Sequence, residues 1–181
     1  MKKKVPVIET ERLVLFGIRR EDAETIVLWR SDPDVYQYFY TPHAITMEEH
    51  MTWYNENYLN NPDRMSWMCI QKSTGRRIGI FGIKKDCSTP EEAEISYLLC
   101  PDGQHQGYGA EAVEGIIRWC RKEGIHEMKA VIHEKNRASI IFIEKMGFQP
   151  VVKEDSFVTY KTCISLVRGG VLENQDNFPK P

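Results

Sequence analysis

The most informative segment of the chain reads Gln104-His105-Gln106-Gly107-Tyr108-Gly109-Ala110. It separates an apolar run that ends near Cys100 from a stretch with helical periodicity that ends near Lys122. Its two glycines let several backbone N–H groups converge on an anion, and the positive N-terminal end of the following helix strengthens that attraction. Residues 104–110 therefore predict a pyrophosphate-binding cradle, although the same glycines also suit an ordinary tight turn.

The cradle matches neither of two common nucleotide-binding motifs. No Gly-Lys-Ser/Thr follows it, as a P-loop would require. A dinucleotide fingerprint needs a third glycine and an acidic residue about 20 residues later in a parallel sheet. The sequence thus disfavours an NTPase and a dehydrogenase.

Hydrophobic periodicity predicts strands and helices on both sides of the cradle. We expect strands at residues 13–18, 67–70, 77–83, 93–99, 128–133, 148–152 and 157–167, and helices at 20–30, 46–59, 109–122 and 136–145. The strands between 67 and 99 form an antiparallel meander, and residues up to 133 complete a parallel βαβ unit with a right-handed crossover. The expected fold class is α/β, with a mixed central sheet of about six to seven strands flanked by helices.

Length and composition indicate one domain. The chain has 181 residues, of which 41% are hydrophobic and 28% charged, and these values are typical of a protein with one packed core. We expect a single domain at residues 1–168. Residues 169–181 have little apolar surface to bury, so they are expected to form a flexible tail.

Charge and hydropathy argue against several kinds of partner. The chain has 24 basic and 26 acidic residues, so we expect no nucleic-acid partner. No apolar run approaches the roughly 18 residues that a membrane span needs, and the start of the chain lacks a signal-peptide pattern. Five scattered cysteines without metal-ligand spacing favour reduced thiols, a cytoplasmic location and no bound metal.

Three motifs in the same order give the chain a resemblance to a known family. The cradle contains Gln104-x-x-Gly107-x-Gly109, which resembles the Gln/Arg-x-x-Gly-x-Gly/Ala hallmark of the GNAT acetyltransferases. Residues 93–98 look like the fourth strand of that family, and residues 136–148 look like its coenzyme-side helix and following strand. Residues 11–15 are similar to the opening of the ribosomal-protein acetyltransferase (RimJ/RimL) branch. The resemblance covers residues 9–168.

The resemblance implies an N-acetyltransferase with acetyl-CoA as co-substrate. The acetyl group would pass directly to a primary amine in a ternary complex. The acceptor is either a protein N-terminal amine or a small amine, such as a polyamine, an aminoglycoside or an amino-sugar nucleotide. Dimers are frequent in the family, so the resemblance also admits a homodimer. The alternative is a non-catalytic acyl-CoA-binding or regulatory module that keeps the cradle.

The resemblance also implies which residues bind the coenzyme. In the family the fourth and fifth strands separate, often with a bulge in the fourth, and pantetheine pairs with the exposed main chain. That role would fall to the main chain of Leu98, Leu99 and Cys100. The remaining coenzyme contacts would come from the cradle, at Gln104, Gln106, Gly107, Tyr108, Gly109 and Ala110, and from the following helix, at Asn136 and Ser139.

Acetyl transfer needs a base for the amine and a proton donor for the leaving thiolate. The resemblance assigns the base to Glu94, which in a strand is otherwise an exposed carboxylate or a salt-bridge partner. Many relatives donate the proton from a tyrosine, but Ile143 occupies that position here. The RimJ/RimL branch carries a serine instead, at Ser139 in this chain, and both Ser139 and Asn136 are also common helix-capping types.

Aromatic residues gather where the family builds its acceptor site. They lie in the stretch Val35-Tyr36-Gln37-Tyr38-Phe39-Tyr40 and, further on, at Trp53, Tyr54 and Tyr58. Aromatic rings bind amines through cation–π contacts, but rings at helical spacing also fill ordinary cores. The sequence leaves both interpretations open.

Overall fold

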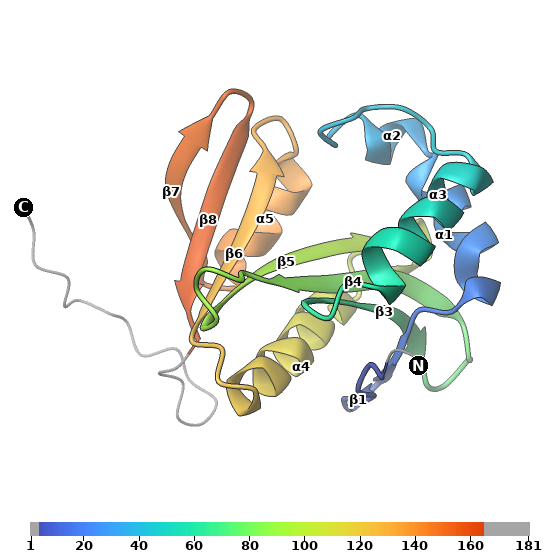
Figure 1. Cartoon of the computed structure of the whole chain (residues 1–181), viewed down its shortest axis with the longest axis horizontal. Helices are drawn as coiled ribbons and strands as arrows, with labels where there is room; N and C mark the ends of the chain where they lie inside the picture. The colour runs from blue at the N-terminus through green and yellow to red at the C-terminus, as the bar shows by residue number, and fades with distance from the viewer. Residues whose placement is uncertain (1–3, 165–181) are drawn as a thin grey trace, which may run out of the picture.

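Eight strands form one mixed sheet in the computed structural model, which describes residues 4–164. Their order across the sheet is β1-β2-β3-β4-β5-β6-β8-β7, and only β5 and β6 run parallel (Figure 1). The strands are β1 (Ile8–Glu9), β2 (Leu13–Gly17), β3 (Arg64–Gln71), β4 (Arg77–Lys85), β5 (Glu92–Leu99), β6 (Glu127–His133), β7 (Gln149–Glu154) and β8 (Phe157–Cys163). The expected α/β class, the meander and the parallel unit are confirmed.

The expected strand number of six to seven is too low by β1. This strand has two residues, and it pairs with Leu15 and Val14 of β2. Two residues are too few to show an alternating pattern, so hydrophobic periodicity does not detect them. The expected extension of β8 to Val167 and the expected tail at 169–181 lie outside the described residues.

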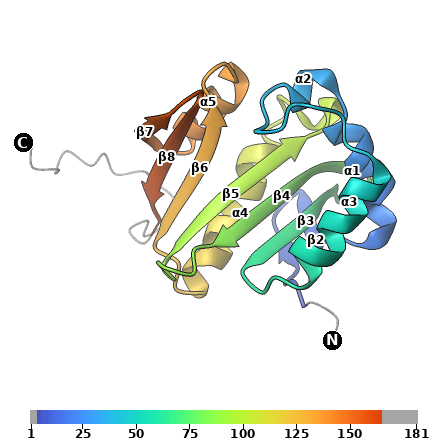
Figure 2. The ribbon, with the colours of Figure 1, turned by 45° about the horizontal axis from the view of Figure 1, so that its top comes forward.

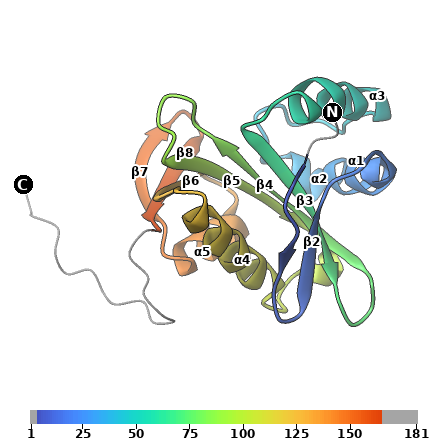
Figure 3. The same ribbon diagram turned by 60° about the horizontal axis from the view of Figure 1, so that its bottom comes forward.

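Helices cover both faces of the sheet. One face carries α4 (Tyr108–Lys122) and α5 (Arg137–Lys145), and the other carries the N-terminal helices (Figure 3). The N-terminal helices are α1 (Ala23–Arg30), α2 (Pro33–Tyr36) and α3 (Met47–Trp53), together with the 3-10 turn η1 (Arg20–Asp22) and the π-helical turn η2 (Tyr54–Leu59) that continues α3. Pro101–Gly103 form a further 3-10 turn, η3. Across residues 4–164, no helix has both the length and the apolar character needed to cross a membrane.

The start of α3 illustrates how local sequence sets the element boundaries. The Oγ1 atom of Thr46 accepts a hydrogen bond from the Glu49 N–H at 3.1 Å, and the Glu49 carboxylate accepts one from the Thr46 N–H at 2.7 Å. This reciprocal capping box satisfies two donors that a helix start leaves free. The spacing Thr46-x-x-Glu49 in the sequence predicts such a box, and the structure confirms it.

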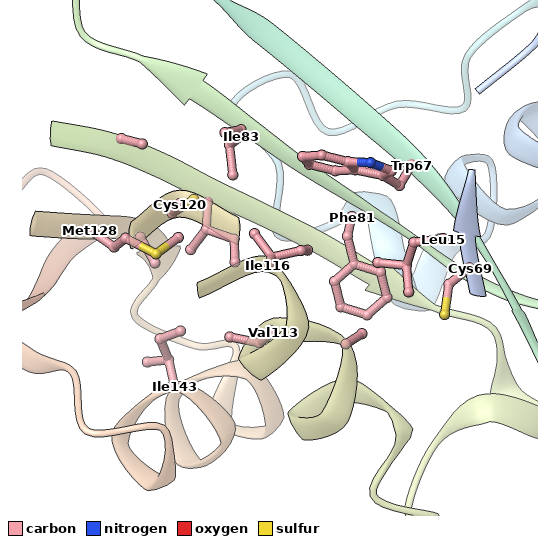
Figure 4. Packing of buried hydrophobic residues seen from close by; sticks show 14 of the residues in the cluster. Leu15, Trp67, Cys69, Phe81, Ile83, Val113, Ile116, Cys120, Met128 and Ile143 are labelled. Atoms are coloured by element: carbon pink, nitrogen blue, oxygen red, sulfur yellow. The ribbon is translucent and has the colours of Figure 1, made fainter. Parts of the chain in front are cut away.

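Two hydrophobic clusters fill the space on the two faces of the sheet. The larger one packs Trp67 and Phe81 of the sheet against Val113 and Ile116 of α4 (Figure 4). The smaller one lies under α1, α3 and η2, and comprises Ile18, Ile26, Tyr54, Tyr58 and Met68. Burial of these apolar side chains fixes the helices against the sheet.

The parallel pair β5 and β6 is short. It holds only three residue pairs, from Glu92 opposite Glu127 to Glu94 opposite Lys129. Beyond them the two strands diverge (Figure 2), while β6 stays paired with β8 along its whole length. The pairing of β5 with β4 continues without a register shift, so this separation needs no bulge in β5.

Candidate active site

A cleft of about 480 Å³ opens where β5 and β6 separate. Its walls come from β5, β6 and the start of α5 at one end, and from the N-terminal helices and β3 at the other. Four of the residues to which the resemblance assigns catalysis or coenzyme binding line it together: Glu94, Leu98, Asn136 and Ser139. The glycine cradle is not part of this lining and forms a second region at the start of α4.

Strand alternation places Glu94 in the cleft. Ala93 and Ile95 are buried toward the core, so Glu94 between them points to the opposite face of the sheet. Its side chain is half-buried, and within residues 4–164 it forms no ion pair. The nearby Tyr40 ring is partly desolvated, and this burial, with the charges of Glu94 and Glu154, raises the pKa of Tyr40. The half-buried Glu94 carboxylate thus faces the cleft without an ion-pair partner in the part of the chain that the structure describes.

Ser139 contacts a tyrosine that the sequence analysis missed. The Tyr97 Oη atom lies 2.8 Å from Ser139 Oγ, and Asn136 caps the same helix turn by accepting the Ser139 N–H at 3.1 Å. Burial raises the pKa of Tyr97 to about 12, so the phenol keeps its proton at neutral pH. The one sequence signal for Tyr97 is a hydroxyl-bearing ring in a strand otherwise rich in aliphatic residues.

Ile143, at the position where many relatives carry a tyrosine, is fully buried. Its side chain points into the large cluster beside Val113 (Figure 4). A residue at this position therefore serves packing in this chain. Ser139 of α5 and Tyr97 of β5 both line the cleft and offer hydroxyl groups that Ile143 lacks.

The glycine cradle has the backbone geometry of an anion site. Gly107 is the N-cap of α4 and adopts φ 78°, a left-handed conformation that favours glycine. The first N–H groups of a helix have no acceptor within it, so those of Tyr108, Gly109 and Ala110 remain available to a ligand. Helix α4 is long enough for its dipole to favour a negative charge at this end.

The two glutamines of the cradle hold the turn together. The Gln104 side chain donates to the Leu99 carbonyl at 3.2 Å, and the Gln106 side chain donates to the Asp102 carbonyl at 2.6 Å. Their amide groups thus brace the loop between β5 and α4. One side-chain N–H of each glutamine is thus used within the loop.

Arg12 is a second residue that the sequence analysis missed. Its guanidinium lies over the Tyr108 ring at 4.6 Å from the centroid and donates to the Gln106 carbonyl at 3.0 Å. It also pairs with Glu111 at 2.6 Å. The residue places a positive charge beside the cradle although it is 94 positions away from Gln106 in the chain. It lies within the segment 11–15 that resembles the RimJ/RimL opening, which was the available signal.

Of Leu98, Leu99 and Cys100, which were expected to offer main-chain groups, Leu99 is best placed. The Cys100 N–H is donated to the Ile78 carbonyl at 3.0 Å, so the main chain of Cys100 faces β4. Antiparallel pairing alternates its hydrogen-bonded residues, so Leu98 also faces β4 and Leu99 faces the open edge toward β6. The Leu99 carbonyl already accepts from Gln104, which leaves its N–H for a ligand.

The aromatic residues divide between the two interpretations left open above. Tyr38, Tyr40 and Trp53 line the cleft, whereas Tyr54 and Tyr58 are buried in the smaller cluster. Tyr40 stacks on Phe157 of β8 with 4.0 Å between ring centroids. Tyr40 therefore connects the segment after α2 with β8 beside the cleft. Within residues 4–164, no group of three His, Cys, Asp or Glu side chains is arranged to hold a metal ion.

Comparison with known proteins identifies the architecture. Residues 12–149 match the family described as the acetyltransferase (GNAT) domain. The uncharacterized N-acetyltransferase YoaA of Bacillus subtilis is 26% identical over 147 residues, with 80% of this chain and 83% of YoaA covered. The uncharacterized protein MJ1062 of Methanocaldococcus jannaschii is 26% identical over 149 residues, and the match covers 80% of this chain and 30% of MJ1062.

Solved structures share the fold. A spermidine N-acetyltransferase from Vibrio cholerae, in complex with CoA and spermine, superposes with a TM-score of 0.71 at 14% identity. The superposition covers 84% of this chain and 94% of that chain. The fold expected from the sequence resemblance is confirmed, and identity this low says nothing of the acceptor.

Proposed function

Because the chain belongs to the acetyltransferase (GNAT) domain family, we propose that it transfers the acetyl group of acetyl-CoA to a primary amine. The observation that carries this proposal is the separation of β5 and β6 after three residue pairs, directly beside the left-handed turn at Gly107. The gap offers unpaired strand edges to pantetheine amides, and the turn offers N–H groups to the pyrophosphate. The acetyl group would then reach the cleft that contains Glu94.

We assign the coenzyme contacts to a few groups. The pyrophosphate would bind the N–H groups of residues 107–110, with Arg12 beside them. Pantetheine would pair with the Leu99 main chain and pass Asn136 and Ser139 at the start of α5. No metal takes part in this scheme.

The proposed reaction is a direct transfer in a ternary complex. Glu94 accepts a proton from the acceptor amine, directly or through a water molecule, and the neutral nitrogen attacks the thioester carbonyl carbon. A C–N bond forms as the C–S bond breaks. The departing thiolate takes a proton from the Ser139 hydroxyl. The second proton, which the nitrogen loses as the amide forms, replaces it through Tyr97 Oη, 2.8 Å from Ser139 Oγ, and Glu94 returns its own proton to water.

The finer assignment is to the RimJ/RimL branch, as a cytoplasmic enzyme with one catalytic domain at residues 1–168. Two features support it. One is the opening at residues 11–15, and the other is Ser139, present in a chain that has Ile143 at the position where other relatives have a tyrosine. The acceptor would be a protein N-terminal amine or a small amine.

The direct test is release of CoA from acetyl-CoA, measured with a thiol reagent against polyamines, aminoglycosides, amino sugars and N-terminal peptides. Cys87 and Cys163 are exposed, so each assay needs a control without acceptor. Turnover with one acceptor class supports the enzyme. Acetyl-CoA binding without turnover on any acceptor favours a non-catalytic acyl-CoA-binding module, and absence of binding contradicts the proposal.

Exchange of Gly107 for alanine is expected to weaken acetyl-CoA binding about tenfold, because a left-handed φ costs a side-chain-bearing residue about 1–2 kcal/mol and relaxation would move the cradle N–H groups. Gly124→Ala is the matched control, since Gly124 has φ 77° at the other end of α4 and open space around it. Calorimetric titration with acetyl-CoA measures both. Equal affinity of the two variants would contradict the cradle assignment.

Removal of the Ser139 hydroxyl by alanine is expected to lower kcat about 10- to 100-fold, because the leaving thiolate loses its proton donor. Tyr97→Phe should give a smaller loss, about three- to tenfold, since the serine remains but its partner is gone. Tyr160→Phe removes another buried phenol that does not line the cleft and is expected to leave kcat unchanged. Steady-state rates at saturating acetyl-CoA measure these effects. A Ser139→Ala variant with normal kcat would contradict the assignment of Ser139 as proton donor.

A further inference from the structure

Two arginines line the acceptor end of the cleft without a carboxylate partner. Arg30 Cζ lies 5.0 Å from the Phe39 ring centroid, and Arg64 Cζ lies 5.9 Å from that of Trp53. Within the described part of the chain, neither guanidinium forms an ion pair, and burial lowers the pKa of Arg30. Partial burial of a cation without a counter-charge lowers the stability of the protein, so a bound anion would stabilise this pair of arginines.

Unpaired buried polar atoms surround the same position. His50 is 2% exposed, and both of its ring nitrogens lack a hydrogen-bond partner, as does the Nε atom of Arg64. The His50 ring lies 5.8 Å from Trp53, and burial, followed by the charge of Arg30, lowers its pKa. Native proteins rarely leave such groups unsatisfied, because each one costs about 1–3 kcal/mol. A polar ligand in the cleft would satisfy them.

The sheet connects this cluster to Glu94. Arg64, Lys84 and Glu94 are opposite one another on β3, β4 and β5, so the Cα atoms of Arg64 and Glu94 lie two strand spacings apart, roughly 10 Å. Arg64 and Glu94 both line the cleft, and Lys84 between them is exposed and does not.

The part of the sheet between the two ends of the cleft carries small side chains. The neighbouring row of the sheet contains Ser66, Gly82 and Ser96. A Cβ atom at Gly82 would come within 3.0 Å of Ser96 Oγ and 3.4 Å of Ser66 Oγ, so a side chain there would fill this space. A small acceptor can therefore lie along the sheet with one end at Glu94 and the other at Arg64.

We propose that the acceptor amine carries an anionic group, a carboxylate or a phosphate, which binds Arg30, Arg64 and His50 while the amine lies at Glu94. The inference rests on the proposed function and specifies its substrate class. Among the lining residues within 4–164, Glu94 is the one carboxylate, against two guanidinium groups. A polyamine or an aminoglycoside would bring its additional positive charges toward these arginines and be repelled.

Matched acceptors test the proposal. CoA release is compared for glucosamine 6-phosphate against glucosamine, and for 6-aminohexanoate against 1,6-diaminohexane. The anionic member of at least one pair is expected to have a kcat/KM at least about tenfold higher, since charge-assisted hydrogen bonds are the strong ones. The two pairs distinguish a phosphate from a carboxylate. Equal rates within both pairs, or faster rates for glucosamine and the diamine, would overturn the proposal.

Variants locate the anion. Arg64→Gln and Arg30→Gln should reduce kcat/KM for the anionic acceptor to that of its counterpart while acetyl-CoA affinity stays at the wild-type value, which also reports that each variant is folded. Arg118→Gln, which removes an exposed charge from α4 on the other face of the sheet, should change neither value. Undiminished preference in both cleft variants would contradict the assignment of the site.

A binding measurement separates failure of this proposal from failure of the proposed function. The melting temperature of the CoA-saturated protein is measured with glucosamine 6-phosphate and with 6-aminohexanoate, because CoA occupies the cradle and removes it as a competing anion site. A rise that Arg64→Gln abolishes supports the anion site even without turnover, and no rise with either compound overturns it. If CoA itself does not bind, the proposed function fails, and the same titration of the free protein decides the anion site.

Discussion

Glutamine in place of Glu94 is expected to lower kcat by about 10²- to 10⁴-fold while acetyl-CoA binds as it does to the wild type. The amide keeps the shape of the carboxylate but cannot accept a proton, so the amine must reach the thioester without a base. The position lies on the cleft face of β5 and lacks an ion-pair partner within residues 4–164, so the exchange breaks no salt bridge there. Rates at saturating acetyl-CoA, together with calorimetric affinity, measure the two effects separately.

The control for this variant is Glu154→Gln. Glu154 is exposed and does not line the cleft. Its charge, like that of Glu94, raises the pKa of Tyr40. Its exchange should leave kcat unchanged. Raising the pH should partly restore the Glu94→Gln rate, because a larger fraction of the amine is then neutral without help. A Glu94→Gln enzyme with the wild-type rate and pH profile would remove Glu94 from the mechanism, whereas loss of turnover with intact binding would exclude the non-catalytic alternative.

Glu92, two residues earlier on the same face of β5, is expected to matter for stability. Its carboxylate pairs with Lys129 and with Lys161, both at 2.8 Å, and its side chain is 12% exposed. These hydrogen bonds, Lys129 first, lower the pKa of Glu92 to about 2. The unfolded chain would titrate near pH 4.3, so the stabilisation is fully present above that pH and is lost as the pH falls toward 2.

Glu92→Gln should therefore reduce the free energy of unfolding at pH 7 by about 2–3 kcal/mol and flatten its dependence on pH below about 4.5. The variant also leaves two lysines facing each other at the paired end of β5 and β6. Denaturant unfolding at pH 7 and pH 3 measures the change. Glu134→Gln, which removes an exposed carboxylate paired with Lys153, serves as the control and should have no measurable effect. An unchanged pH dependence in Glu92→Gln would show that the cluster does not act in this way.

The two glutamates show what the sequence could and could not tell. The strand expected at residues 93–99 included Glu94 but not Glu92, and nothing in the local pattern said that Glu92 meets two lysines from β6 and β8 while Glu94 forms no ion pair in the described chain. Pairing of this kind depends on which strands become neighbours. The sequence therefore identified the strand and the candidate base and left the role of Glu92 unseen.

Local signals predicted local structure well. The capping box at Thr46 and the periodicity of α4 depend on residues three or four apart, and both appear as expected. Contacts that cross the chain were missed: Arg12 reaches Gln106, and Tyr97 reaches Ser139. The unpaired ring nitrogens of His50 could not be predicted for another reason, because they become visible only once the fold surrounds the ring.

The three residue pairs between β5 and β6 also join two parts of the sheet that are synthesised one after the other. Strands β1–β5 draw only on residues 8–99, whereas β6–β8 draw only on residues 127–163. A nascent chain can therefore complete every hydrogen-bonded ladder of β1–β5 before residues 127–163 have emerged from the ribosome. The later half then docks through α4 and three residue pairs, and the open edges of β5 and β6 are present from that moment, before any ligand is encountered.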